Sequence, residues 1–425
     1  MYTVNSLRKP VNADFVGIYD CSDGVSMTLY ENVSTEDFIA YKDALVTDGY
    51  AVYDNTDYAG NVHFTLKKDG MLVQLYRSTD SRMRVVADNY TADYDKEQIV
   101  TERKCNTEIY QFETDHSLID CGMCYIIRCA DNSFFIIDSA HNLSVHDNER
   151  IHDFLRSMTP ENEKIRIAGW FVSHGHDDHY SKFMDYLIYN CEDTVIEKIY
   201  INLVSAQHPD CGRWDKYNTA LMEEFRAFIN NKCDIPIVKL HTGQRFCVRN
   251  LQFDVICTHE DVYPCTNADF NDSSVVLMLE AEGSRILIPG DASVQESIVM
   301  EERYGDWLKS DIVQLSHHGH IGTSDKFYRY VNADVVLCPN TQIKIDEEFP
   351  RLVADRVAKA ISKEFYVSAN GTVKLTLPYK LGTAEVFPDE TTEDFVSIKF
   401  LWGYDYSPEF KANHIAQYFK RSRKQ

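Results

Sequence analysis

The chain has 425 residues, of which 44% are hydrophobic and 26% are charged, as in ordinary globular proteins. This length allows two or three domains and a large core. The formal net charge of −23 argues against nucleic acid as a partner, because an anionic surface repels phosphate backbones. No apolar run reaches the roughly 20 residues that span a bilayer, and the N-terminus lacks the apolar core of a signal peptide. We therefore expect a cytoplasmic protein without a membrane partner, whose 12 cysteines are mostly reduced.

Residues 1–100 are predicted to form a small α+β accessory domain. A strand is expected at residues 25–30, and Ser34 with Asp37 resembles a capping box that opens a helix. Strand-like runs follow at residues 62–66, 71–76 and 83–86, and Asp69-Gly70 is a strong hairpin signal between the first two. His63 is the one histidine of this unit. The unit is expected to be a binding, lid or dimerisation module, and the sequence leaves these alternatives open.

From residue 105 to 380 apolar strands alternate with turns and helices. Paired strands are expected at residues 124–128 and 134–138, a helix at 147–158, and a second hairpin at 275–279 and 285–288. The lone CxxC at Cys121 and Cys124 has no second pair at zinc-ribbon spacing, so core packing is the better interpretation. Residues 381–425 form an aromatic-rich C-terminal extension that could pack on the same chain or on a second subunit, which leaves a homo-oligomer open. A basic run at residues 420–424 is expected to be a solvated tail.

The segment from Ser173 to His179 contains three imidazoles and two carboxylates within seven residues. Neutral imidazole nitrogen and carboxylate oxygen are the ligands that zinc, manganese and iron accept. An apolar strand precedes the segment and a helix follows it, so the cluster lies on a strand-to-helix turn where several ligands can converge. The pattern therefore predicts a metal site.

Two further strands end on metal-binding residue types. An apolar strand at residues 286–288 is followed by Pro289, Gly290 and Asp291, and a second strand ends on His317-His318-Gly319. Ionisable groups just past buried strands lie at the edge of the sheet, where α/β enzymes place their chemistry. Together with the histidine cluster, this order predicts a site for two metal ions.

An HxHxDH turn, then a strand ending in Gly-Asp, then a strand ending in His-His-Gly resembles the metallo-β-lactamase superfamily. The motifs at residues 271–277, 288–291 and 316–319 are similar to the ComEC-like (competence-protein type) hydrolase domains, as are the early strand at 134–138 and the closing segment at 369–373. The resemblance covers residues 105–380. It implies an α/β (α+β) fold, a four-layer αββα sandwich, here with the small N-terminal α+β domain added.

The resemblance also implies a ligand set. His174 and His176 would hold one metal, Asp178 and His179 the other, and Asp291 would bridge them. One of His317 and His318 would complete the ligand set of the second metal. His318 is the favoured ligand, and His317 would then contact the substrate or donate a proton. Asp177 is not a ligand in the family, so an indirect or solvated role is expected.

A third histidine ligand is expected for the first metal. His259 is the leading candidate because it follows a strand-like run at residues 253–257, although ComEC-like proteins often lack this ligand. His208 is a weaker candidate, and His241 precedes what looks like a structural turn. Tyr180, Ser181 and Lys182 stand where relatives usually have a glycine pair, which makes the substrate class poorly transferable.

The function implied by the resemblance is that of a binuclear metal-dependent hydrolase. Two divalent cations, zinc first with manganese or iron as alternatives, would share a bridging hydroxide at neutral pH. Asp178 and His317 are the candidate catalytic residues. We expect a small-molecule substrate, first a phosphoester or phosphodiester. The alternatives are hydrolysis of a carboxyl ester, lactone or amide, an iron-dependent redox enzyme of the same superfamily, and a non-catalytic binding module.

Overall fold

The structure is a computed structural model that describes residues 4–388 apart from residues 22–23, 90–91, 100–101, 117–118, 120, 145, 209–215, 266, 268 and 348. The basic run at residues 420–424 and nearly all of the predicted C-terminal extension lie outside the described residues. In the described part, no helix combines the length and the apolar character needed to cross a membrane.

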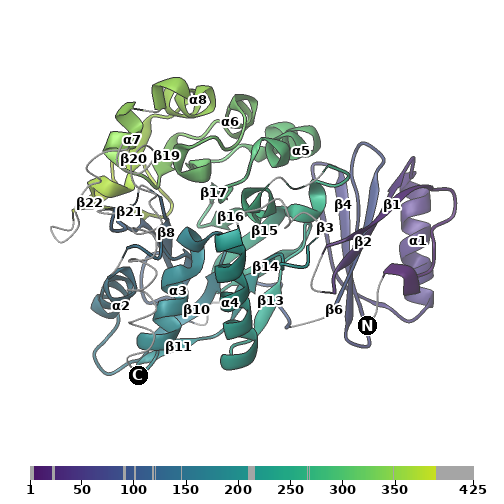
Figure 1. Cartoon of the computed structure of the whole chain (residues 1–425), viewed down its shortest axis with the longest axis horizontal. Helices are drawn as coiled ribbons and strands as arrows, with labels where there is room; N and C mark the ends of the chain where they lie inside the picture. Colours follow the sequence, from purple (N-terminus) through teal and green to yellow (C-terminus); the bar gives the residue numbers. More distant parts are fainter. Residues whose placement is uncertain are drawn as a thin grey trace.

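Two β-sheets form the body of the protein (Figure 1). One sheet has nine strands in the order β13-β12-β10-β9-β8-β7-β21-β22, with β11 beside β10. Its strands are β7 (Glu108–Gln111), β8 (Cys124–Arg128), β9 (Phe134–Asp138), β10 (Ile165–Phe171), β11 (Thr194–Ile196), β12 (Ile199–Ile201), β13 (Ile237–Lys239), β21 (Thr372–Thr376) and β22 (Glu385–Phe387). The other sheet has seven strands in the order β14-β15-β16-β17-β18-β19-β20. They are β14 (Arg245–Val248), β15 (Leu251–Cys257), β16 (Val276–Ala281), β17 (Ser284–Ile288), β18 (Ile312–Gln314), β19 (Val335–Cys338) and β20 (Glu364–Val367).

The two sheets pack face to face and helices cover both outer faces. Between the sheets, the rings of Phe135 and Phe253 lie 4.5 Å apart within one apolar core built from both sheets. On the nine-stranded sheet, Trp170 stacks on Phe183 at 4.1 Å beneath the covering helices, which are α2 (Asp147–Ser157), α3 (Asp177–Tyr189) and α4 (Lys216–Lys232). The seven-stranded sheet carries α5 (Val294–Tyr304), α6 (Asp325–Val331) and α8 (Val353–Ile361), with the short α7 (Gln342–Glu347) before α8. The predicted four-layer αββα sandwich is confirmed.

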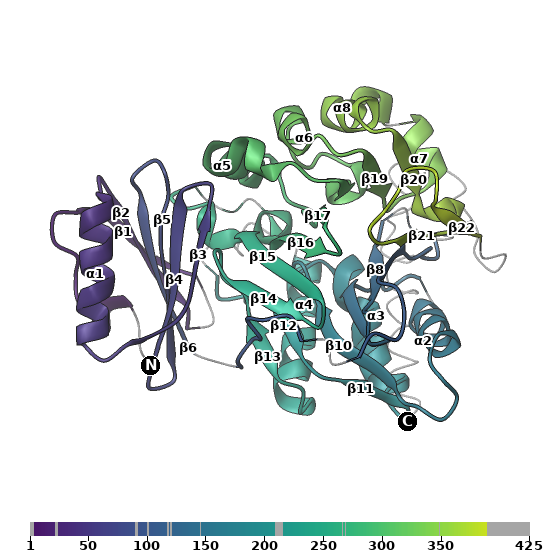
Figure 2. The ribbon, with the colours of Figure 1, turned by 180° about the vertical axis from the view of Figure 1, so that it is seen from behind.

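A third sheet, formed by the N-terminal residues, lies to one side of the sandwich (Figures 1 and 2). Its order is β1-β2-β6-β5-β4-β3, and α1 (Thr35–Thr47) covers one face through Phe38 and Leu45. Ser34 caps this helix by accepting the Asp37 N–H at 3.0 Å. The strands are β1 (Asp14–Asp20), β2 (Ser26–Glu31), β3 (Ala51–Tyr58), β4 (Asn61–Lys68), β5 (Met71–Arg77) and β6 (Met83–Asn89). Asp69 and Gly70 join β4 to β5 with φ of 48° and 78°, as a tight hairpin turn requires.

Buried polar contacts attach the other face of this N-terminal sheet to the sandwich. Gln74 donates to the Thr242 carbonyl at 2.8 Å, and the Tyr58 hydroxyl donates to Asp254 at 2.8 Å. Gly243 has φ of +93°, and a Cβ there would lie 2.2 Å from the ring of His63. Only glycine permits this approach, so the two parts fit closely at this point.

The parallel strands of each sheet bring chemically active residues to one edge of the sandwich. In the nine-stranded sheet, β9, β10 and β12 run parallel, and in the seven-stranded sheet β17, β18, β19 and β20 do. Because parallel strands end at the same edge, the residues that follow them gather there. Asp138 ends β9, His174 follows β10, Asp291 follows β17 and His318 follows β18.

Candidate metal centre

The turn from β10 into α3 carries the histidine cluster, as the sequence predicts. His176 is the residue before α3, with extended φ and ψ of −82° and 147°, and Asp178 and His179 lie in the first helical turn. A Cβ on Gly175 would lie 2.7 Å from Sδ of Met222 and 2.9 Å from the ring of Phe270. The turn is therefore packed tightly against α4 and against Phe270, which restricts how its side chains can move.

The second set of side chains comes from the ends of β17 and β18. Asp291 is 1% exposed, and its N–H is held by the Ser274 hydroxyl at 3.2 Å. His317 and His318 have φ of 51° and 53°, a conformation that non-glycine residues adopt only when their surroundings fix it. Asn340 supplies one such restraint, because its Nδ2 donates to the His318 carbonyl at 2.6 Å.

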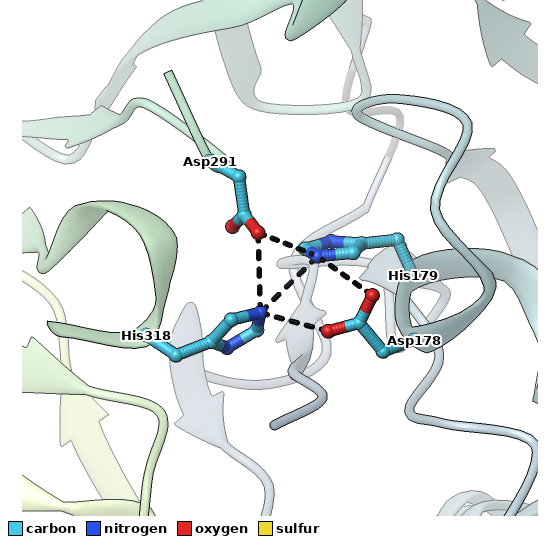
Figure 3. Close-up of side chains that lie close together, drawn as sticks. All are labelled: Asp178, His179, Asp291 and His318. Carbon is cyan, nitrogen blue, oxygen red and sulfur yellow. Dashed lines mark hydrogen bonds and ion pairs between the residues drawn. The ribbon is translucent and has the colours of Figure 1, made fainter. Parts of the chain in front are cut away.

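Asp178, His179, Asp291 and His318 form the first group of candidate ligands and point toward one another (Figure 3). One donor atom from each lies within 4.8 Å of the others. Nε2 of His318 is 3.0 Å from Asp178 and 3.3 Å from Asp291, and Nε2 of His179 is 3.2 Å from Asp291. All four residues are buried.

His174, His176 and Asp291 form the second group. Nε2 of His174 lies 3.1 Å from Nδ1 of His176 and 3.8 Å from Oδ2 of Asp291. Asp291 belongs to both groups, as the bridging residue of the predicted pair of metals would. The structure thus brings together every predicted ligand from the HxHxDH turn, the Gly-Asp strand end and His318.

Neighbouring acceptors hold the outer ring nitrogens of three histidines. Nδ1 of His179 lies 2.8 Å from Oδ2 of Asp138, and Nδ1 of His318 lies 3.2 Å from the Pro339 carbonyl. Nδ1 of His174 is 3.1 Å from the Ser173 hydroxyl, which itself donates to Asp138. Each acceptor favours a proton on Nδ1, and each Nε2 is then left with a lone pair that faces the group of ligands.

The electrostatics of the cluster favour positive charge at its centre. Burial alone would raise the pKa of the Asp291 carboxyl, but the imidazoles of His179 and His318 hold it well below its usual range. Burial would lower the pKa of His318, whereas Asp291 and Asp178 raise it to about 9. A divalent cation would supply the same positive charge between the carboxylates.

Two observations support the fit of metal ions to these residues. Nε2 of His179 and Nε2 of His318 face each other at 3.2 Å, and two imidazole nitrogens directed at the same point suit a shared cation. Oδ1 of Asp291 is buried and has no hydrogen-bond partner among the described residues. Nitrogen and oxygen donors of this kind suit zinc, iron and manganese.

Asp138 is a functional residue that the sequence analysis did not single out. It is fully buried, with φ of +56°, and it accepts from the Ser173 N–H at 2.7 Å as well as from His179. Carboxylates that orient a ligating histidine raise its basicity and fix its tautomer. The signal in the sequence was a carboxylate that ends an otherwise apolar strand of phenylalanine and isoleucine.

His259 is not in either group of ligand atoms among the described residues. His259 follows β15, and β16 lies between β15 and β17 in the sheet. The turn His259–Asp261 is fixed on the side of the N-terminal sheet, because Asp261 contacts Tyr76 and Arg303. The ring of His259 lies 5.8 Å from that of His208, whose Nε2 is 3.0 Å from the Tyr263 hydroxyl. The expected third histidine therefore lies outside the cluster.

The remaining candidates take other roles. Asp177 is buried and lies 3.6 Å from Nε2 of His141, outside both ligand groups. His241 is held between Glu260 at 2.7 Å and Asp88 at 3.1 Å, in the contact with the N-terminal sheet. Cys124 is a buried free thiol, and Cys121 is half-buried.

His317 lies beside the metal ligands and has a fixed ring orientation. Its Nδ1 is 2.8 Å from the Ile321 carbonyl, and its Nε2 is 3.3 Å from Nδ2 of Asn271. The ring of His320 lies 5.3 Å away. Burial lowers the pKa of His317. A proton on Nδ1 directed at the carbonyl leaves Nε2 as the nitrogen that can exchange protons.

Comparisons with known proteins give distant similarities to solved structures. No family model and no curated protein matches the chain. The metallo-β-lactamase fold protein YhfI from Bacillus subtilis is 11% identical, with 61% of this chain and 96% of that chain covered and a TM-score of 0.39. CmlA, a diiron β-hydroxylase from Streptomyces venezuelae, is 10% identical over 65% of this chain and 55% of its own, with a TM-score of 0.38. A long form RNase Z from yeast is 11% identical over 65% of this chain and 42% of its own, with a TM-score of 0.36.

These likenesses are distant, and none of the three proteins is described as ComEC-like. The chain spans about half the length of CmlA and less of the RNase Z. The fold rests on the two packed sheets and their covering helices, and the candidate metal centre rests on the two ligand groups that share Asp291. The protein therefore combines a mixed α/β sandwich with a buried His/Asp cluster suited to metal ions.

Proposed function

We propose that the protein is a metal-dependent hydrolase with a binuclear centre, of the ComEC-like type that its motifs resemble. His174, His176 and Asp291 would hold one metal, and Asp291 would be shared with a second metal held by Asp178, His179 and His318. Zinc is the first expectation, with manganese or iron as alternatives. The observation that carries the proposal is the pair of ligand groups joined by one carboxylate, in which only His176 is half-buried rather than buried.

The chemistry divides between the ions and the side chains around them. When bound, two metal ions polarise the scissile group and lower the pKa of water toward neutrality. Asp138, Ser173 and Pro339 orient the ligand imidazoles through their Nδ1 atoms. His317 holds one proton on Nδ1 against Ile321, so its Nε2 can take up a second proton and pass it to the leaving oxygen.

A small phosphoester is the proposed substrate class. Besides the ligand His318, the residues His317 and His320 lie in the same turn. Burial lowers the pKa of His320, and the charge of the buried Lys344 lowers it further. These donors suit an anionic substrate oxygen beside the cations. The net charge of −23 favours a small substrate over a long polynucleotide.

The test is turnover by metal-loaded protein. Chain stripped with a chelator and reloaded with Zn²⁺, Mn²⁺ or Fe²⁺ is assayed on bis(p-nitrophenyl) phosphate and on a carboxyl ester, a lactone and an amide. We expect metal-dependent cleavage of the phosphodiester that is lost in Asp178→Ala and Asp291→Ala. Asp185→Asn, on the same helix as Asp178 and paired with Lys182, is the matched control and keeps activity.

Two results would contradict the proposal. Cleavage of the ester, lactone or amide without any phosphoester cleavage would overturn the substrate class. Oxygen consumption by an iron-loaded protein with a visible absorption band, and no hydrolysis, would overturn the reaction type in favour of redox chemistry.

A further inference from the structure

The two groups of candidate ligands are unequal. Asp178, His179, Asp291 and His318 give four side-chain donors, whereas His174, His176 and Asp291 give three. The histidine expected to complete the smaller group, His259, lies outside it. Within the described part of the chain, a further side-chain donor near His174 and His176 would therefore have to come from a residue other than histidine, cysteine or a carboxylate.

Asn271 is such a residue. It lies in the turn Phe270–Ser273 and is 7% exposed. Its Oδ1 is buried and has no hydrogen-bond partner among the described residues. A buried amide oxygen without a donor is destabilising, so an oxygen in this position calls for a cation or a donor from a ligand.

The hydrogen bonds of His317 fix which way the amide of Asn271 points. The Ile321 carbonyl accepts from Nδ1 of His317 at 2.8 Å, and in this tautomer Nε2 is an acceptor. Nδ2 of Asn271 lies 3.3 Å from that Nε2 and is the only amide atom able to donate to it. Oδ1 is consequently the atom left without a partner.

The turn that carries Asn271 packs on the smaller ligand group. The ring of Phe270 lies 5.4 Å from the ring of His176, and the Ser274 hydroxyl holds the backbone N–H of Asp291 at 3.2 Å. The turn that carries the free amide oxygen thus contacts His176 through Phe270, Asp291 through the adjoining Ser274, and His317 through Asn271 itself.

We propose that Oδ1 of Asn271 is a ligand of the metal ion held by His174, His176 and Asp291, in the place that the missing third histidine would take. The inference rests on the proposed metal centre and not on the substrate. A neutral amide oxygen is a harder donor than imidazole, so this position favours ions such as Mn²⁺ or Fe²⁺ more than a three-histidine site would. The two metal positions then differ in affinity, and the ion beside Asn271 is the more easily exchanged.

The experiment titrates metal alone into the chelator-stripped full chain and follows stoichiometry by elemental analysis and the visible spectrum of bound Co²⁺. Wild type is expected to take up two equivalents in two steps. Asn271→Leu keeps the size of the side chain and removes the oxygen. It should weaken the affinity of one step by about 10-fold or more, because even the loss of residues that only hydrogen-bond to a ligand lowers metal affinity by about 10–100-fold. The other step should be unchanged.

Two further variants separate ligation from folding and from the contact with His317. Asn271→Asp supplies a charged oxygen in the same place and is expected to tighten the step that Asn271→Leu weakens, with a shifted Co²⁺ spectrum. His317→Gln removes the partner that orients the amide but keeps the oxygen, so it should weaken the same step by less than Asn271→Leu does. If Asn271→Leu does not fold, the direction of change in Asn271→Asp decides the question.

Failure of this inference is distinguishable from failure of the proposed function. Wild type that binds no metal would overturn both. Wild type with two equivalents, together with Asn271→Leu and Asn271→Asp that bind both with unchanged affinity and an unchanged Co²⁺ spectrum, would overturn the ligand role alone. In that case a raised KM in Asn271→Leu would assign the amide oxygen to a donor on the substrate.

Discussion

Oδ2 of Asp138, at the end of β9, lies 2.8 Å from Nδ1 of His179, in the first turn of α3. Both side chains are fully buried. The carboxylate fixes the imidazole so that Nε2 faces Asp291 and His318, and it does so from a neighbouring parallel strand of the same sheet. The orientation of one metal ligand therefore depends on a residue 41 positions away in the chain.

This relationship predicts that Asp138→Asn weakens metal binding without removing a ligand. The amide keeps the shape of the carboxylate but stabilises the His179 proton less, so affinity at the position held by His179 should fall about 10–100-fold. Metal titration with Zn²⁺ or Co²⁺ measures the change. Asp131→Asn, which alters a carboxylate in the turn before β9, is the control. Wild-type affinity in Asp138→Asn would show that the carboxylate does not support the ligand.

The two adjacent histidines are expected to fail in different ways. His318→Gln should lose one of the two metals, because Nε2 of His318 lies within 3.3 Å of both Asp178 and Asp291. His317→Gln should keep both metals and lower kcat by about 10²–10⁴-fold, the usual contribution of a proton-transfer group. Elemental analysis and steady-state kinetics on the same preparations separate the effects. Metal loss in His317→Gln with full occupancy in His318→Gln would reverse the assignment.

The buried ion pair between Arg303 and Asp261, both in the sandwich, is predicted to stabilise the carboxylate that contacts the N-terminal sheet. Asp261 also accepts from the Tyr76 hydroxyl, and Arg84 donates to the Asp261 and Tyr263 carbonyls at 3.2 and 2.8 Å. Arg303→Met leaves the Asp261 carboxylate buried without its cation, which should lower the free energy of unfolding by about 3–5 kcal/mol. Urea denaturation of the variant and of wild type measures this difference in the free energy of unfolding.

The control for this prediction is the double variant Arg303→Met with Asp261→Asn. It removes the uncompensated charge and is expected to recover part of the lost stability. A single variant as stable as wild type would mean that the pair contributes nothing to the attachment.

The His241 imidazole predicts a pH dependence of stability in the alkaline range. Burial would lower its pKa, but Glu260 and Asp88 raise it to about 9. Because the folded pKa exceeds the unfolded value of about 6.5, this stabilisation is fully present below pH about 6.5. It is lost as the pH rises through about 9. The contribution at pH 7 is on the order of 2 kcal/mol.

Urea midpoints of wild type and His241→Gln, compared between pH 7 and pH 10, test this. Wild type should lose more stability over that interval, whereas other alkaline groups titrate in both proteins and cancel in the difference. Parallel profiles would mean that His241 is not held as an imidazolium in the folded protein.

Local sequence determined much of the architecture. Apolar runs bounded by turn residues gave the positions of β8 and β9, and the Ser34 cap and the Asp69-Gly70 turn placed α1 and the β4–β5 hairpin. The strands β1 and β3 were not predicted, because β1 is largely exposed and β3 carries polar side chains on both faces. An edge strand pairs on one side only and needs little apolar sequence.

The sequence by itself identified the turn from His174 to His179, since spacing along a strand, a tight turn and one helical turn fixes which side chains share a face. It also singled out Asp291 and the His317-His318 pair, because each follows an apolar strand. The tertiary structure decided the rest. Pairing of parallel strands carries Asp138, Asp291 and His318 to the same edge, and sheet-on-sheet packing brings those edges together. The same packing leaves His259 on the side of the N-terminal sheet and places Asn271 beside His317. The physical reason is that distances between strands depend on hydrogen-bonded register and core packing rather than on order in the chain.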